Sequence, residues 1–208
     1  MKLIVGLGNI GQEYESTRHN VGFMVLEQFY KDFQTVEKTI WEDSRKFRAD
    51  IAKIEWKPLH GEITKVALAK PKTYMNNSGL AVHSISQYLN IPISDIWVVH
   101  DDVDLPLGSI RIRTGGSSGG HKGVQSVMDQ LKSEKFVRFR LGVGHPHRAS
   151  NTHISKKSFV KDVDEFVLSP FSASEKGKVK DLIKRASKAM QMALEDGLIP
   201  AMNKYNTK

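Results

Sequence analysis

Short apolar runs and amphipathic stretches follow one another along this chain in an order typical of α/β proteins. Leu3-Ile4-Val5 and Ile96-Trp97-Val98-Val99 are continuous apolar runs, as expected of strands buried on both faces. Residues 110–113 and 136–143 instead alternate apolar residues with arginines, which predicts strands with one apolar face. The predicted strands are residues 3–5, 46–57, 63–70, 96–99, 110–113 and 136–143.

Helical periodicity separates these strands. Leu26, Phe29, Tyr30 and Phe33 recur at helical spacing, which predicts a helix over residues 20–33 with Asn20 as its N-cap. The other predicted helices are one that begins at Asn77-Ser78 with an apolar face of Leu80, Ala81, Ile85, Tyr88 and Leu89, one around residues 124–131, a short turn over 163–168 and a long basic helix over 172–195.

The alternation of strands and helices predicts a three-layer α/β sandwich, with a twisted, mixed and mostly parallel sheet between helices on both faces. The chain has 208 residues, without internal repeats or a Gly/Ser linker, so we expect a single domain over residues 1–208. Residues 147–162 are rich in Ser, Lys and His and poor in apolar residues, which favours a mobile loop.

Composition narrows the class of protein. The chain has no cysteine, which excludes disulfides and thiolate chemistry and suits a cytoplasmic protein. We expect no membrane partner, because no stretch approaches the roughly 18 to 20 apolar residues that span a bilayer. The formal net charge of +8 favours a polyanionic partner, with simple solubility as the alternative. No large unexplained apolar face is evident, so we expect a monomer without an obligate protein partner.

The segment Gly6-Leu7-Gly8-Asn9-Ile10-Gly11 fits the G-x-G-x-x-G pattern of dinucleotide sites. A true site needs a helix that begins at the third glycine and an acid at the end of the next strand. Here the helix is predicted to begin only near Asn20, and the candidate acid, Asp32, falls on that helix. The context therefore disfavours a nucleotide-dependent oxidoreductase.

Polar loops follow several predicted strands, and ligands of open α/β sheets bind outside the carboxyl ends of strands. A histidine with a carboxylate partner can deprotonate water, and asparagines can orient a carbonyl or donate to an oxyanion. His19, Asp101, Asn9 and Asn76 form such a set, although a lone loop histidine is more often structural.

Other polar segments keep two interpretations at this stage. His145-Pro146-His147 and His100-Asp101-Asp102 resemble metal ligands but lack a supporting spacing. Ser117-Ser118-Gly119-Gly120 is either a flexible turn or an anion-holding loop. The basic helix over 172–195 is either a solvated face or a surface for phosphates.

Several of these motifs together resemble the bacterial-type peptidyl-tRNA hydrolase family. The resemblance covers nearly the whole chain in the family's order, and the T-R-H-N-x-G and H-D-x-x-D-L-P segments are its most specific parts. The matching segments are Val5 to Gly11, Tyr14, Thr17 to Gly22, Lys70 to Gly79, His100 to Pro106 with Gly108, Gly115 to His121, Arg138 to Pro146 and Val163 to Leu168.

The resemblance implies hydrolysis of the ester between a peptide and the 3′ ribose of a tRNA, in the rescue of tRNAs that leave the ribosome prematurely, without metal or cofactor. The family's general base corresponds to His19 and its orienting carboxylate to Asp101. Asn9 corresponds to the residue that helps distinguish peptidyl-tRNA from unblocked aminoacyl-tRNA. The remaining implied roles are substrate and water positioning by Asn76, cleft lining by Tyr14 and Tyr74, and contacts with acceptor-arm phosphates by Arg113 and Arg140.

Two positions depart from the family pattern. Ile10 replaces a proline, which relaxes the backbone without changing the chemistry. Lys122 stands where the family has an asparagine, and an ammonium donates but cannot accept hydrogen bonds. We therefore expect Lys122 to bind substrate, so that activity persists but the affinity for the substrate is altered. The alternative is an RNA-binding protein on the same fold with little or no hydrolysis.

Overall fold

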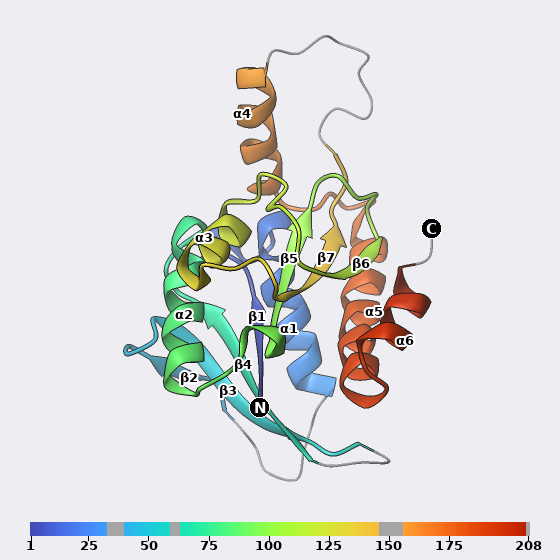
Figure 1. Ribbon diagram of the computed structural model, residues 1–208. Coiled ribbons are helices and arrows are strands. Elements are labelled where there is room, and N and C mark those ends of the chain that lie inside the picture. The colour runs from blue at the N-terminus through green and yellow to red at the C-terminus, as the bar shows by residue number, and fades with distance from the viewer. Residues whose placement is uncertain (33–39, 59–62, 146–155, 207–208) are drawn as a thin grey trace.

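The computed structural model describes residues 1–32, 40–58, 63–145 and 156–206, which build one twisted seven-stranded sheet (Figure 1). The strand order is β2-β3-β4-β1-β5-β7-β6. The four central strands are mutually parallel, and the outer strands run antiparallel to their neighbours, so the mixed sheet is confirmed. The strands are β1 Lys2–Gly6, β2 Glu42–Ser44, β3 Ala49–Trp56, β4 Thr64–Pro71, β5 Ile96–Asp102, β6 Ile110–Thr114 and β7 Val137–Gly142.

Helices cover both faces of the sheet, as predicted. One face packs against α2 and α3 and the other against α1, α5 and α6, while α4 stands beyond the carboxyl ends of β5 and β7 (Figure 1). The α-helices are α1 Val21–Asp32, α2 Ser78–Tyr88, α3 Lys122–Leu131, α4 Lys156–Val167, α5 Lys176–Glu195 and α6 Leu198–Tyr205. Short 3-10 helices are η1 Gln12–Tyr14, η2 Arg18–Asn20, η3 Met75–Asn77 and η4 Ile93–Asp95. None of the helices in these described ranges is long and apolar enough to cross a bilayer.

The side-chain alternation of the strands divides the apolar interior into two clusters. In β5, Trp97 and Val99 pack toward α1 and α5, while Ile96 and Val98 pack toward α2 and α3. All four side chains are buried, as the continuous apolar run predicts. The sheet is therefore the central layer of three, and its parallel strands end together at one edge.

One strand, β2, and one α-helix, α6, were not predicted. In α2, two residues of the predicted apolar face are exposed. β2 consists of Glu-Asp-Ser and contains no apolar residue that could indicate a strand. It is a strand because its backbone pairs with that of β3. α6 is short and follows α5 after only two residues, Asp196 and Gly197, so the pattern did not separate it. In α2, Leu80 and Tyr88 are 38% and 60% exposed, because the helix packs through Ala81, Val82 and Ile85.

The predicted loop over residues 147–162 is wrong where it overlaps α4. The helix begins at Lys156, well before the short turn predicted at 163–168. Phe159, Val163 and Phe166 recur at helical spacing in the sequence, a signal that the abundance of Ser and Lys obscured. Residues 146–155 lie outside the described residues, as does Phe33 of the first predicted helix.

The contact between α2 and α3 depends on Gly79. Its backbone N–H donates to Ser126 Oγ at 3.0 Å, and a Cβ at this position would collide with the Ser126 carbonyl. Gly177 in α5 offers a matched comparison, because a Cβ there meets no atom within 4 Å.

We expect Gly79→Ala to lower the free energy of unfolding by about 2 kcal/mol or more, because overpacking forces two helix backbones apart. Gly177→Ala is expected to raise it by about 0.5 to 1 kcal/mol, because alanine loses less conformational freedom in a helix. Urea denaturation of both variants measures the difference. Equal stabilities would contradict the close helix contact.

Candidate active site

Polar side chains from distant parts of the chain meet where the parallel strands end. His19 lies in η2, after β1, and Asp101 lies near the end of the neighbouring strand β5. His121 immediately precedes α3, on the loop that follows β6. Loops after different strands thus meet at one edge of the sheet, as expected for an open α/β fold.

One carboxylate oxygen joins two histidines at this edge. Oδ1 of Asp101 lies 2.8 Å from Nδ1 of His19 and 2.9 Å from Nε2 of His121. Asp101 is 2% exposed and His19 is 8% exposed, so the contact is almost entirely shielded from solvent. The predicted pairing of His19 with Asp101 has hydrogen-bonding geometry, whereas His121 was not among the predicted site residues.

Backbone contacts determine which nitrogen of His121 carries the proton. The N–H groups of Gly123 and Val124 donate to His121 Nδ1 at 3.1 and 3.2 Å, so that nitrogen has a lone pair. His121 is therefore the N-cap of α3, and its Nε2–H donates to Asp101. The signal available in the sequence was its place directly before a predicted helix, although histidine is not a common capping residue.

The same oxygen also determines the orientation of His19. An ionised carboxylate can only accept, so Nδ1 of His19 carries the proton that it donates to Asp101. Nε2 is then left with its lone pair. The imidazole is consequently held in the tautomer that a general base requires.

The charge states of the buried groups follow from their surroundings. Burial alone would raise the pKa of the Asp101 carboxyl, but the rings of His19 and His121 and their hydrogen bonds hold that pKa well below its usual range. Burial and the neighbouring His121 hold the pKa of His100 well below its ordinary value. His100 is therefore neutral, and its Nδ1 lies 2.7 Å from the Asp101 carbonyl oxygen.

His19 and Asp101 open onto a cavity of about 170 Å³ at the foot of α4. Lys122, another predicted site residue, lines the same cavity. Its Nζ lies 2.6 Å from Oδ2 of Asp164 in α4, so an ion pair crosses the cavity mouth. The remaining lining residues are Asp102, Val103, Asp104, Ser118, Gly119, Gly120, His121, Val163 and Val167.

Asn9 does not line this cavity but a separate hollow that it shares with Asn20, and it is held by two other segments. Its Oδ1 accepts from the Met75 N–H at 2.9 Å, which ties the loop after β1 to η3. The side-chain amide of Asn20 accepts from Asn9 N–H and donates to Asn9 C=O, at 2.8 and 2.9 Å. The predicted N-cap role of Asn20 is therefore wrong, because its side chain fixes the Asn9 backbone. Nδ2 of Asn9 makes no hydrogen bond within the described ranges.

The other predicted residues surround these groups without touching the histidines. Asn76 is exposed in η3, next to the Met75 amide that Asn9 binds. Tyr74 is 55% exposed and has a backbone φ of 55°, in the left-handed region. Tyr14 is half-buried in η1. None of the three lines the cavity at His19.

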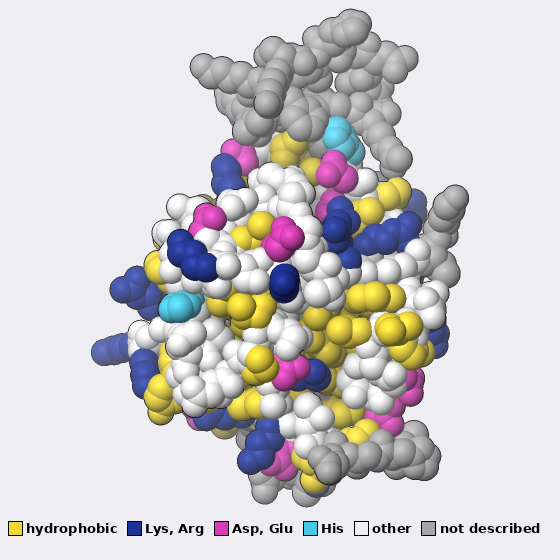
Figure 2. All heavy atoms as spheres, in the orientation of Figure 1, with side chains coloured by type: hydrophobic (Ala, Val, Ile, Leu, Met, Phe, Trp, Pro, Cys, Tyr) yellow, Lys and Arg dark blue, Asp and Glu magenta, His cyan; other side chains and the backbone are white. Residues whose placement is uncertain are grey.

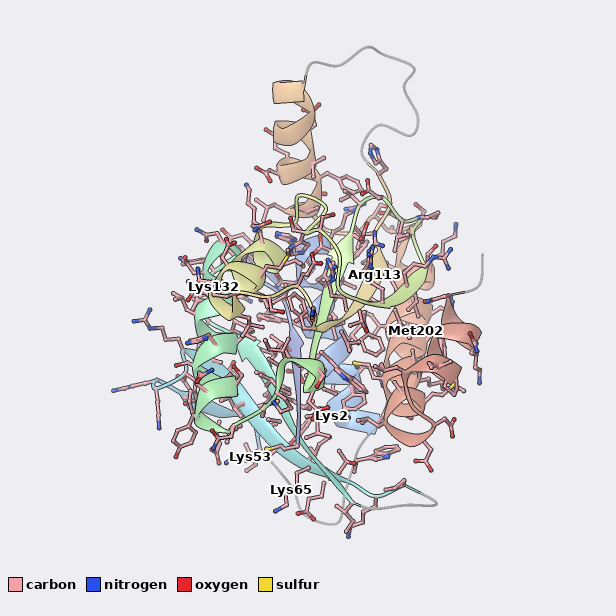
Figure 3. The ribbon with its side chains drawn as sticks, in the orientation of Figure 1. Lys2, Lys53, Lys65, Arg113, Lys132 and Met202 are labelled. Atoms are coloured by element: carbon pink, nitrogen blue, oxygen red, sulfur yellow. The ribbon has the colours of Figure 1, made fainter. Side chains whose placement is uncertain are left out.

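Arginines occupy the face of β6 and β7 that is turned toward α3. Arg113 is exposed near the end of β6 (Figure 3), whereas Arg140 pairs with Asp102 at 2.6 Å. Arg138 is 2% exposed and donates to the carbonyl groups of Gly115, Gly116 and Ser117. Lys and Arg side chains gather over the upper end of these strands (Figure 2).

The glycines of the opening motif serve close packing. A Cβ at Gly8 would lie 2.8 Å from the Phe23 ring, and one at Gly22 would lie 2.5 Å from the carbonyl oxygens of Leu7 and Val99. α1 therefore begins in direct contact with the β1 and β5 backbones, and η1 and η2 occupy the chain between Gly11 and this helix. Because no α-helix begins at the third glycine, this arrangement argues against a dinucleotide site, as the sequence predicted.

His19, Asp101 and His121 are also the one group of possible metal ligands within the described ranges, with ligand atoms within 4.8 Å of one another. The nitrogens that face Asp101 are both engaged in hydrogen bonds to it. The other nitrogen of His121 accepts from two backbone amides. The donor set therefore fits a hydrogen-bonded base better than a metal site. Of the histidine pair at 145 and 147, only His145 is described.

Comparison with known proteins bears on this site. The family described as peptidyl-tRNA hydrolase matches residues 3–208. The chain is 42% identical over 206 residues to the peptidyl-tRNA hydrolase of Geobacillus kaustophilus, covering 99% of this chain and 100% of that protein. It is 41% identical over 209 residues to that of Thermodesulfovibrio yellowstonii, covering 99% of both.

Solved structures agree with the sequence comparison. The crystal structure of the Acinetobacter baumannii peptidyl-tRNA hydrolase superposes with a TM-score of 0.82 at 33% identity, covering 100% of this chain and 95% of that one. A peptidyl-tRNA hydrolase in complex with N-propanol gives a TM-score of 0.83 at 31% identity, with the same coverage. The family match spans nearly the whole chain, and the chain therefore belongs to the peptidyl-tRNA hydrolase family.

Proposed function

We propose that this protein hydrolyses the ester between the C-terminus of a peptide and the 3′-terminal ribose of a tRNA. The observation that carries the proposal is the buried pair of His19 and Asp101, which leaves one imidazole nitrogen with a lone pair beside a cavity. Family membership supplies the substrate class, and the geometry supports a mechanism that needs only water and side chains.

In this mechanism His19 Nε2 takes a proton from a water molecule, and the oxygen of that water attacks the ester carbonyl carbon. The imidazolium that forms is stabilised by the Asp101 carboxylate, which keeps its negative charge throughout. The tetrahedral intermediate then collapses, and the imidazolium returns the proton to the departing ribose oxygen. The products are a tRNA hydroxyl and a peptide carboxylic acid, which releases its remaining proton to the solvent and becomes a carboxylate.

Asparagines and tyrosines would position the peptide end. Nδ2 of Asn9 can donate to a peptide carbonyl of the substrate, while its Oδ1 stays on Met75 N–H. That contact favours a substrate with a peptide carbonyl next to the ester and so discriminates against unblocked aminoacyl-tRNA. Asn76 would orient substrate and water, and Tyr14 and Tyr74 would line the approach.

The RNA part of the substrate would lie toward β6 and β7. Arg113 makes no ion pair within the described ranges and is exposed, so it is available to a phosphate. Arg140 would contribute through its partly shielded pair with Asp102. Lys122 would bind a phosphate or a carbonyl group of the substrate after leaving Asp164.

His19→Ala is expected to lower kcat with N-acetyl-aminoacyl-tRNA by about 10² to 10⁴, the usual contribution of a general base. Binding of deacylated tRNA should remain near the wild-type value, because His19 is buried and touches no phosphate in this mechanism. The same change at His83 in α2 is the control and should leave kcat unaltered. Wild-type turnover by His19→Ala would disprove the mechanism, and failure of the wild-type protein to cleave this substrate would favour the RNA-binding alternative.

The variant Asp101→Asn tests whether the carboxylate holds His19 in the tautomer with the proton on Nδ1. An amide NH2 can donate to Nδ1 of His19, which would move the ring proton to Nε2 and remove the base. We expect a fall in kcat of about 10³ to 10⁴ with little change in tRNA affinity. Asp129→Asn, on the exposed side of α3, controls for the loss of one carboxylate. A kcat within about twofold of wild type for Asp101→Asn would contradict the role of the carboxylate.

Opposite changes in KM are expected on breaking the ion pair from either side. Lys122→Asn removes a cation from the cavity and should raise KM about two- to fivefold, the scale of one exposed charge contact, with kcat nearly unchanged. Asp164→Asn frees the same ammonium and should lower KM. Steady-state kinetics of both variants measure these changes. Identical kcat and KM for Lys122→Asn and wild type would exclude a substrate contact.

A further inference from the structure

The lysines of α5 border a hollow of about 310 Å³ between α5 and α1. Lys176, Lys180 and Lys184 recur every four residues and therefore form one row along the helix. The hollow beneath them is apolar, with Met24, Phe171, Val179 and Ile183 among its lining residues. This surface, which we call the α5 groove, is not used by the mechanism above.

The α5 groove has an unbalanced positive charge. None of its three ammonium groups makes an ion pair with any residue in the described ranges, and no acidic residue lines the hollow. The nearest acids along the helix are already engaged: Glu175 binds Arg18 at 2.8 Å, and Asp181 binds Arg185 at 3.2 Å. An apolar floor with a row of free cations suits an extended ligand that carries both apolar and acidic groups.

A second hollow lies between this surface and Asn9, the candidate site residue that follows β1. It measures about 430 Å³ and is lined by Asn9 and Asn20 at one end and by Met24 of α1 at the other. Met24 also lines the α5 groove, so the two hollows adjoin along the exposed face of α1. Its two lysines are paired with acids of the same hollow, Lys70 with Glu27 at 2.5 Å and Lys72 with Asp50 at 3.4 Å, so neither is a free cation.

The substrate has two parts that diverge from the ester. Arg113 and Arg140 lie on the face of the sheet that carries α3, whereas α1 and α5 cover the opposite face. If the tRNA lies over the arginines, a peptide that leaves the ester past Asn9 enters the second hollow and reaches α1 at Met24. We propose that the α5 groove binds the peptide part of the substrate and favours peptides with acidic residues upstream of the C-terminus. This inference rests on the proposed function.

The spacing of the lysines supports an extended peptide. Four residues of helix rise about 6 Å, which separates successive lysines of the row. Side chains on one side of an extended peptide repeat about every 6.6 Å, because two residues of strand span that length. Acidic residues at alternate positions can therefore face successive lysines, while the apolar residues between them meet the floor or the solvent.

The experiment compares peptidyl-tRNAs that share one tRNA and one C-terminal residue. One peptide carries three glutamates at alternate positions, a second carries glutamines there, and the triplet is moved stepwise away from the C-terminus. We expect kcat/KM of the wild-type protein to favour the glutamate peptide about fivefold, as two or three exposed ion pairs would give. The preference should appear only once the triplet is far enough upstream to reach α5.

Variants separate the groove from general charge effects. Lys180→Gln/Lys184→Gln should abolish the preference, and Lys180→Glu/Lys184→Glu should reverse it in favour of a lysine peptide. Lys53→Gln/Lys65→Gln removes the same charge at the end of the molecule far from α4 (Figure 3) and should retain the preference. The short substrate N-acetyl-aminoacyl-tRNA should be cleaved equally by all of these variants.

Each other outcome overturns the inference. If the groove binds tRNA instead, Lys180→Gln/Lys184→Gln will lower kcat/KM equally for short and long substrates. If no glutamate preference appears at any position of the triplet, the groove does not bind the peptide. Failure of the wild-type protein to cleave the short substrate would instead contradict the proposed function, so the two failures are distinguishable.

Discussion

The arrangement of the site depends on the single oxygen of Asp101 that accepts hydrogen bonds from both His19 and His121. These three residues come from η2, from β5 and from the start of α3, so one buried carboxylate joins a loop, a central strand and a helix. A buried carboxylate is costly unless it is well satisfied, and here two ring N–H groups satisfy the same oxygen. The Asp101 carboxylate therefore needs no hydrogen bond from water at this oxygen, and the same two hydrogen bonds fix the orientation of both imidazole rings.

The fold brings these groups together through its parallel centre. β1 and β5 are neighbours and run in the same direction, so the loop after β1 and the end of β5 share an edge. The two glycines at positions 8 and 22 allow α1 to begin against that edge, and η2 fills the chain between the strand and the helix. The adjacent residues His19 and Asn20 then make different contacts: His19 binds Asp101, and Asn20 binds the Asn9 backbone.

Much of this could be predicted from the sequence, for reasons that also explain the failures. Apolar runs such as residues 96–99 report burial directly, and the strands and most helices followed from them. His19 and Asp101 were recognisable because their residue types and motifs carry chemistry. The roles of His121 and Asn20 were not, because each depends on which backbone amide lies within reach, and that is determined by tertiary contacts. β2 could not be predicted because its side chains carry no pattern and only its backbone pairs with β3.

The net charge of +8 illustrates why a bulk property is a weak guide to a partner. Several cations that contribute to it are already neutralised: Arg18 by Glu175, Lys70 by Glu27, Lys122 by Asp164 and Arg140 by Asp102. An engaged cation must first lose its partner before it can bind a phosphate or carboxylate, so it contributes less to affinity than an unpaired one. The unpaired cations in the described ranges include Arg113 on one side of the sheet and the α5 lysines on the other. The distribution of free charge, and not its total, is therefore the basis on which we propose that the two ends of the substrate lie on opposite sides of the sheet.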